Sequence, residues 1–145
     1  MRSQYKVWKL VDVPKRYQEG LLPLHTPGGM MRGFMMRAWN MPLANTAVPT
    51  YETYRKLLED ILVVAYYLDG RAVAISMAEG LTRESFGTRI HVYVNREYRR
   101  RGIGTRVIKR MLREIKMYNP RRVFGSPFSP EGVRTFNAAK VEVEI

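Results

Sequence analysis

The stretch that decides the fold of this 145-residue chain is Val92-Tyr93-Val94-Asn95-Arg96-Glu97-Tyr98-Arg99-Arg100-Arg101-Gly102-Ile103-Gly104-Thr105. It joins an apolar run typical of a strand, residues 90–94, to a periodic run typical of a helix, residues 104–117. Because glycines open that helix directly after a strand, several backbone N–H groups and the positive end of the helix dipole point at one spot. The three arginines beside this spot favour a site for a phosphate-rich ligand.

The surroundings of this turn hold most of the positive charge of the protein. Residues 89–122 contain twelve lysines and arginines against two acids, Glu97 and Glu114, and the whole chain has a net charge of +12. The partner is therefore expected to be anionic: nucleic acid, an anionic lipid surface, an acidic protein or a polyphosphate cofactor. The alternative is a charged surface that only keeps the protein in solution, but the clustering favours a localised anion site.

Length and composition indicate a single domain, residues 1–145, with a core of its own. A hydrophobic content of 46% argues against disorder. The sequence has no cysteine, which excludes disulfides and a thiol nucleophile. Residues 1–6 are not followed by the apolar segment of a secretory signal. No stretch of the sequence approaches the roughly 18 apolar residues of a membrane-spanning helix. We therefore expect a cytoplasmic protein with neither a secretory signal nor a membrane span.

Outward from the turn, the spacing of apolar residues predicts an alternation of strands and helices. Asp69-Gly70 separates two apolar runs and is a strong hairpin signal. Thr50 is a suitable N-cap for the helix that follows it. Residues 23–49, which contain many prolines and glycines, are expected to be irregular. The predicted strands are residues 5–13, 61–68, 71–78, 88–94, 122–126 and 141–145, and the predicted helices are residues 15–22, 51–60, 102–117 and 130–140.

Three phosphate-binding motifs compete for the glycine turn. A Walker loop requires Gly-x-x-x-x-Gly-Lys-Ser/Thr, which this sequence does not contain. A dinucleotide fingerprint requires a third glycine at the position where Val107 stands. What remains is a short turn, Arg99-x-x-Gly102-x-Gly104, between an apolar strand and a helix whose apolar residues form one stripe.

With this turn and its Glu97-Tyr98 approach, the chain resembles the GCN5-related N-acetyltransferase (GNAT) superfamily. The turn is similar to that family's coenzyme A motif, Gln/Arg-x-x-Gly-x-Gly/Ala, and the order of elements is also the family's. The resemblance implies an α/β (α+β) fold, with a mixed, mostly antiparallel sheet of about six strands flanked by about four helices. It also implies that the fourth and fifth strands splay apart, and the family's final hairpin is expected to be shortened in this chain.

The resemblance implies an activity as well: transfer of an acetyl group from acetyl-CoA to a primary amine by direct attack on the thioester. Backbone amides of residues 101–105 would cradle the pyrophosphate of coenzyme A, with Arg106 as a further contact. The pantetheine arm would lie along the fourth strand, where a bulge in the family splays the strands and a main-chain N–H stabilises the oxyanion. No metal is expected. The candidate cofactor-binding residues are Val92, Tyr93, Val94, Arg99, Arg100, Arg101, Gly102, Ile103, Gly104 and Thr105.

Four residues are candidates for proton transfer. Many family members carry a tyrosine acid on the last helix, and Asn137 stands at that place, although an amide does not donate a proton. The family's base often lies on the strand face that Val92 occupies, whereas His91 and Tyr93 lie on the opposite face by simple alternation. His25 lies near the expected acceptor side. A water chain, or an acceptor amine that is already neutral, is the alternative to a dedicated base.

Two further features allow more than one interpretation. Ser126 and Ser129 are expected near the cofactor, where either can bond the pantetheine or cap the last helix. The segment of residues 23–49 can pack into the core, or its flexible thioethers can line an adaptable acceptor pocket. Five of the nine methionines lie there: Met30, Met31, Met35, Met36 and Met41.

Three functions compete. The first is an acetyl-CoA-dependent N-acetyltransferase whose acceptor is anionic: an acidic protein, an amine on nucleic acid such as aminoacyl-tRNA, or a small phosphorylated amine. The second is a nucleic-acid-binding module that uses the exposed Arg/Lys face of the 102–117 helix. The third is a catalytically silent acetyltransferase fold used for binding, as Asn137 suggests. An open sheet edge beside a shortened hairpin favours a homodimer.

Overall fold

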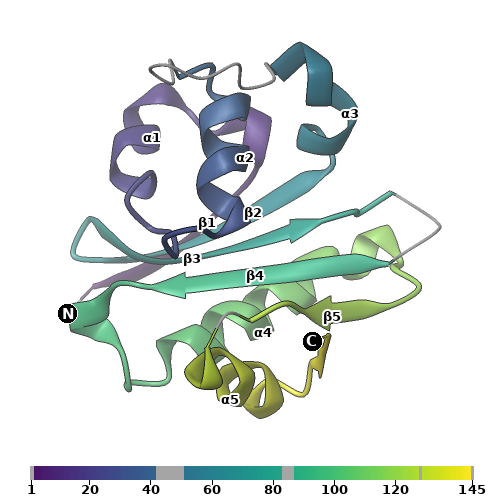
Figure 1. Ribbon diagram of the computed structural model, residues 1–145. Helices are drawn as coiled ribbons and strands as arrows, with labels where there is room; N and C mark the ends of the chain where they lie inside the picture. Colours follow the sequence, from purple (N-terminus) through teal and green to yellow (C-terminus); the bar gives the residue numbers. More distant parts are fainter. Residues whose placement is uncertain (1, 42–50, 83–86, 128, 145) are drawn as a thin grey trace.

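The computed structural model describes residues 2–41, 51–82, 87–127 and 129–144. Within them, six strands form one sheet whose order follows the chain (Figure 1). They are β1 (Ser3–Lys9), β2 (Ile61–Leu68), β3 (Arg71–Glu79), β4 (Thr88–Val94), β5 (Val123–Gly125) and β6 (Glu142–Val143). β1 to β4 pair antiparallel, whereas β4 with β5 and β5 with β6 pair parallel. The predicted mixed, mostly antiparallel sheet is confirmed.

Helices cover both faces of this sheet (Figure 1). One face carries α1 (Lys15–Leu21), α2 (Met30–Ala38) and α3 (Arg55–Leu58), and the other carries α4 (Ile103–Ile115) and α5 (Pro130–Ala138). The described residues therefore contain one α-helix more than the four predicted. None of the helices in this part of the chain has the length and apolar character needed to cross a bilayer.

The additional helix is α2, which lies in the segment predicted to be irregular; that prediction is wrong for residues 30–38. Most prolines and glycines of the segment flank the helix, and only Gly33 lies inside it. Met31, Phe34 and Met35 recur at helical spacing and are buried in the core beneath α2. Burial of this apolar stripe outweighs the weak helix propensity of the segment.

Other elements differ from the prediction mainly at their ends. The helix predicted over residues 51–60 is a 3-10 turn, Tyr51–Tyr54, followed by α3, and its expected N-cap Thr50 lies outside the described residues. The first strand ends at Lys9, because residues 10–12 form a 3-10 turn. β5 and β6 are each shorter than predicted, and α4 gives way to a 3-10 turn over Lys116–Tyr118.

The predicted hairpin between β2 and β3 is confirmed. Asp69 and Gly70 have φ values of +49° and +81°, the left-handed conformations that a two-residue hairpin turn requires. β2 and β3 are buried on both faces and so divide the core into two parts. One part lies between the sheet and α4 with α5, and the other lies between the sheet and α1 to α3.

β4 and β5 separate after a short paired stretch. Their parallel pairing runs from Thr88 opposite Val123 to Ile90 opposite Gly125, while β4 continues beside β3 as far as Val94. The predicted splay between the fourth and fifth strands is thus present. The register between β3 and β4 shows no shift, however, and the irregularity seen in the described part of the sheet lies between β2 and β3 at Tyr66 and Tyr67. The family's bulge in the fourth strand is therefore not seen in this pairing.

Close packing between β5 and α5 fixes the position of β5 where it diverges from β4. A Cβ on Gly125 would lie 2.5 Å from Cδ1 of Phe136, whose ring is fully buried. Only glycine at this position lets the Phe136 ring lie directly on the strand. α5 is thereby fixed over the end of β5, next to the gap that opens along β4.

Candidate active site

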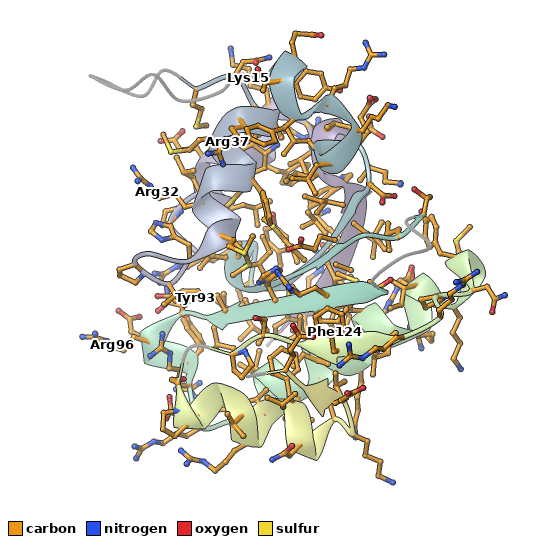
Figure 2. All side chains as sticks on the ribbon, turned by 45° about the vertical axis from the view of Figure 1, so that its right-hand side comes forward. Lys15, Arg32, Arg37, Tyr93, Arg96 and Phe124 are labelled. Atoms are coloured by element: carbon orange, nitrogen blue, oxygen red, sulfur yellow. The ribbon has the colours of Figure 1, made fainter. Side chains whose placement is uncertain are left out.

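A cavity of about 970 Å³ opens where β4 and β5 diverge. Five parts of the chain line it: β4, the turn that leads into α4 with the start of that helix, the segment that follows β5, α5, and the segment between α1 and α2 with the start of α2. The carboxyl end of β4, with Tyr93 and Arg96, lies at the side of the molecule in Figure 2. The cavity thus brings together nearly all the predicted site residues: His25, His91, Val92, Tyr93, Val94, Arg99, Arg100, Gly102, Ile103, Gly104 and Thr105.

The amino end of α4 faces this cavity without a cap from a side chain. Gly102 precedes the helix with φ of +74°, and its carbonyl accepts the first helical hydrogen bond from the Arg106 N–H at 3.2 Å. The N–H groups of Ile103, Gly104 and Thr105 therefore have no partner within the helix. Together with the helix dipole they form a site for an anion.

The two glycines of the turn have different structural roles. Gly102 is required for its left-handed backbone, and a Cβ there would meet open space. A Cβ on Gly104 would lie 3.1 Å from Thr135 Cγ2 and 3.3 Å from Val94 Cγ2. Gly104 therefore lets α4 pack closely against α5 and β4, a role that the sequence did not predict.

The three arginines of the turn take different positions. Nε of Arg99 donates a hydrogen bond to the Val94 carbonyl at 2.9 Å. Arg100 is highly exposed and lies 3.7 Å from the Glu131 carboxylate on α5. Both line the cavity, whereas Arg101 lies over the Tyr98 ring and does not line it. Arg99 and Arg100 are thus placed to meet an anion in the cavity, and Arg101 is not.

Backbone groups of Val92 face the splay. The Ile90 carbonyl accepts a hydrogen bond from the Ser126 N–H at 3.4 Å, and the Val94 carbonyl accepts the one from Arg99. Alternate residues of a strand direct their N–H and C=O groups to the same side. Val92 therefore directs its N–H and its C=O to the same side of β4, the side of β5. Val92 lies between Ile90, which is bonded to Ser126, and Val94, which is bonded to Arg99, and β5 no longer pairs with β4 at this position.

A buried acid–histidine pair lies on the opposite face of β4. Nε2 of His91 is 2.6 Å from Oε2 of Glu79 on β3, and the exposed fractions of these side chains are 3% and 14%. The His91 ring lies edge-on to Phe34 of α2, with 6.1 Å between ring centroids. His91 and Tyr93 thus occupy the face that strand alternation predicted. Glu79 was not predicted, because the loop between β3 and β4 leaves their register undefined in the sequence.

The remaining predicted residues fall into two groups. His25 lines the cavity, and its Nδ1 is buried without a hydrogen-bond partner among the described residues. Ser126 and Ser129 also line the cavity, and Ser129 Oγ accepts a hydrogen bond from the Gly132 N–H at 3.1 Å, so it caps α5. Asn137 is exposed on α5 and does not line the cavity. Arg106 points elsewhere, over the Tyr66 ring.

Sequence reasoning missed two cationic side chains that line the cavity, Arg96 and Arg134. Arg96 was visible in the sequence as part of the basic stretch before the turn. Arg134 belongs to α5, which is brought to the cavity by the packing of Phe136 on Gly125 and of Thr135 on Gly104. Met30 and Met31 line the cavity as well, whereas Met35 is buried in the core. The core-packing interpretation of the methionine-rich segment is therefore confirmed for Met35, whereas an acceptor pocket lined by its thioethers stays a prediction.

Several solved structures share this fold over almost the whole chain. A structure of AAC(6')-Iy in complex with the bisubstrate analog CoA-S-monomethyl-acetylneamine is 15% identical, with 98% of this chain and 92% of that chain covered and a TM-score of 0.61. A ribosomal-protein-alanine N-acetyltransferase from Brucella melitensis biovar Abortus 2308 is 16% identical, with 99% and 93% covered and a TM-score of 0.59. Glucosamine-6-phosphate N-acetyltransferase from Arabidopsis thaliana is 14% identical, with 100% and 95% covered and a TM-score of 0.59.

Sequence comparison places the chain in a family. A search of curated proteins gave no match. The family model described as the acetyltransferase (GNAT) family matches residues 32–124, which is more than half of the chain and includes β2 to β4, α4 and the start of β5. The expected resemblance is confirmed, and this chain belongs to the acetyltransferase (GNAT) family.

Proposed function

We propose that this protein is an acetyl-CoA-dependent N-acetyltransferase that acts on a primary amine by direct attack of the amine on the thioester. The observation that carries the proposal is the meeting, in one cavity, of the uncapped amino end of α4 with the Val92 backbone, which has no strand partner on the β5 side among the described residues. The first feature suits a pyrophosphate and the second suits an amide-bearing arm. Coenzyme A has both parts in the same molecule.

The residues present suit two parts of coenzyme A, the pyrophosphate and the pantetheine arm with its thioester. The N–H groups of Ile103, Gly104 and Thr105 would hold the pyrophosphate, and Arg99 and Arg100 would add charge-assisted hydrogen bonds. The Val92 backbone would pair with the pantetheine arm or bind the thioester carbonyl oxygen, where an N–H donor stabilises the developing negative charge. Acetyl-CoA is a substrate here and supplies the activated acetyl group.

The first test of this proposal is calorimetric titration of the protein with acetyl-CoA at about 0.15 M salt, with inorganic pyrophosphate and ATP as charge-matched controls. Micromolar affinity for acetyl-CoA that exceeds the affinity for both controls is expected. Equal affinity for all three ligands, or no binding of acetyl-CoA, would refute the proposal, because a basic surface alone does not distinguish them.

The acceptor is proposed to carry negative charge or to be attached to an anionic molecule. Arg96 and Arg99 line the cavity beside the uncharged side chains of Met30, Met31 and Tyr93. Cationic groups at the entrance raise the local concentration of an anionic substrate. An amine of an acidic protein, an amine on nucleic acid and a small phosphorylated amine all meet this requirement, and an acetyl-transfer panel of these three classes distinguishes them.

A second candidate function is nucleic-acid binding by the face of α4 that turns away from the cavity. Arg106, Lys109 and Arg113 are exposed along this face, Lys116 is exposed in the 3-10 turn that follows it, and Arg110 lies over the Tyr5 ring. Binding to phosphates would make the logarithm of the affinity fall linearly with the logarithm of the salt concentration. Fluorescence anisotropy with a labelled RNA strand over a salt series measures that slope, and absence of binding at low salt would exclude this function.

A further inference from the structure

We propose that Glu79 and His91 form the proton-accepting pair of the active site: His91 takes the proton of the acceptor amine, and Glu79 positions it. This inference rests on the acetyl transfer proposed above and deepens it. The juxtaposition that carries it is a 2.6 Å contact between Nε2 of His91 and Oε2 of Glu79, both largely buried, with His91 in the cavity wall.

The contact with Glu79 determines which nitrogen of His91 can accept a proton. A carboxylate only accepts hydrogen bonds, so the neutral imidazole must carry its hydrogen on Nε2 and donate it to Glu79. The lone pair of the ring is then on Nδ1. A neutral imidazole in this tautomer is a proton acceptor whose orientation is held by the carboxylate, as in other histidine bases.

The surroundings restrict the imidazole to one orientation. Phe34 packs edge-on against the ring from α2, and the hydroxyl of Ser76 donates a hydrogen bond to the His91 carbonyl at 2.7 Å. The pair is thus held by β3, β4 and α2 together. The other titratable or charged side chains that line the same cavity are His25, Tyr93, Arg96, Tyr98, Arg99, Arg100, Glu131 and Arg134.

The position of His91 suits an acceptor that enters from the α2 side. Alternation along β4 places His91 on the face of α2, while the Val92 backbone points into the splay where the thioester would lie. Met30 and Met31, at the start of α2, line the same cavity as His91 and Tyr93. The amine would therefore lie between the imidazole and the thioester.

The step that this pair serves balances without a further reactant. The amine nitrogen forms a bond to the acetyl carbon, the carbon–sulfur bond breaks, and the sulfur keeps the electron pair as a thiolate. The proton lost by the nitrogen goes to Nδ1 of His91, and Glu79 stabilises the imidazolium. The thiolate takes a proton from solvent, and His91 returns its own to solvent. General base catalysis of this kind contributes about 10²–10⁴-fold in rate.

The experiment combines kinetics with a direct readout of the tautomer. Acetyl transfer from acetyl-CoA is measured with phosphoethanolamine and with a peptide that has a free amino terminus, for the wild type, His91→Gln and Glu79→Gln. Glu59→Gln, which changes an exposed acid that pairs with Arg55 and does not line the cavity, is the matched control. We expect kcat to fall about 100-fold or more in His91→Gln and about tenfold or more in Glu79→Gln, with acetyl-CoA affinity unchanged.

The dependence of kcat on pH distinguishes a Glu79 that positions His91 from a Glu79 that only supports the fold. In Glu79→Gln the imidazolium loses its anionic partner, so the acidic limb of the kcat profile moves to lower pH.

Nitrogen NMR of labelled wild-type protein should show the hydrogen on Nε2 and a bare Nδ1, independently of any acceptor. Retention of kcat within twofold in both variants, or a hydrogen on Nδ1 in the wild type, would overturn the proposal. Loss of acetyl-CoA binding by the wild type would instead refute the proposed function.

Discussion

Nε of Arg99 donates a hydrogen bond to the carbonyl oxygen of Val94, 2.9 Å away, and the guanidinium carbon of Arg99 lies 5.3 Å from the centroid of the Tyr93 ring. The side chain therefore joins the turn before α4 to the end of β4. Because Nε is used in this bond, the two terminal nitrogens of the guanidinium are left for a ligand in the cavity. A lysine has a single nitrogen and cannot serve both functions.

Arg99→Lys is expected to weaken acetyl-CoA binding about tenfold. The substitution keeps the positive charge but removes either the contact with Val94 or the contact with the phosphate, and hydrogen bonds to charged groups contribute about 1.5–3 kcal/mol. Calorimetric titration measures the change. Arg101→Lys is the matched control, since Arg101 does not line the cavity. An equal loss in both variants would mean that charge alone matters.

Thr105→Glu is expected to weaken acetyl-CoA binding by tenfold or more without destabilising the protein. Thr105 lies in the first turn of α4 and lines the cavity, so a carboxylate there would occupy the place of the pyrophosphate and repel it. An acid in the first turn of a helix stabilises that helix by about 0.3–1 kcal/mol, so the thermal midpoint should not fall.

The control for this variant is Lys109→Glu, which makes a larger charge change at an exposed position one turn farther along α4. Its acetyl-CoA affinity should stay within about twofold of the wild type, because its charge is screened at physiological salt. If both variants bind acetyl-CoA as tightly as the wild type, the amino end of α4 is not the pyrophosphate site.

Much of this architecture could be predicted from local sequence signals. Asp69-Gly70 determines a turn whatever its surroundings, and the apolar stripe of α4 is long enough to define one buried face. The α2 segment escaped prediction because Gly33 and the flanking prolines obscure a short stripe. Its helical state depends on burial of Phe34 and its neighbours against the sheet.

The candidate site was predicted only where it lies within one continuous stretch. Residues of β4 and the turn are adjacent in the sequence, so their convergence followed from the motif. Glu79 and Arg134 come from other elements, and their positions depend on strand register and on the packing of α5 against Gly125. Such long-range geometry leaves no periodic signal in the sequence.

Gly125→Ala is expected to destabilise the protein by about 1–3 kcal/mol, the usual cost of overpacking a core. The new methyl group would lie within 2.6 Å of three atoms of the Phe136 ring, so α5 must move away from β5. Urea unfolding measures the loss. Gly20→Ala is the control, since that glycine lies in α1 with no atom within 4 Å of the added carbon, and it should be neutral or stabilising. Equal stability of Gly125→Ala and the wild type would contradict the packing described for Phe136.

The acid stability of β6 is expected to depend on Arg122. Its guanidinium donates two hydrogen bonds to the Glu142 carboxylate, at 2.7 and 3.2 Å, and these bonds hold the pKa of Glu142 below its ordinary value of 4.5. Because the pKa is lower in the folded chain, the pair stabilises the fold at pH values above the unfolded pKa. This stabilisation is lost as the pH falls through the folded-state pKa.

In Arg122→Gln the Glu142 carboxylate loses its partner, so the urea midpoint should fall less steeply than that of the wild type when the pH is lowered from about 5 to 3. Amide hydrogen exchange of Glu142 and Val143 should be faster than in the wild type near neutral pH, because β6 pairs only with β5 in the described sheet. Arg121→Gln removes the same charge from an exposed neighbour and should follow the wild type. Parallel curves of urea midpoint against pH for the wild type and Arg122→Gln would show that the ion pair does not stabilise β6. Addition of about 1 M salt should reduce the difference between the two curves, since both side chains of the pair are exposed.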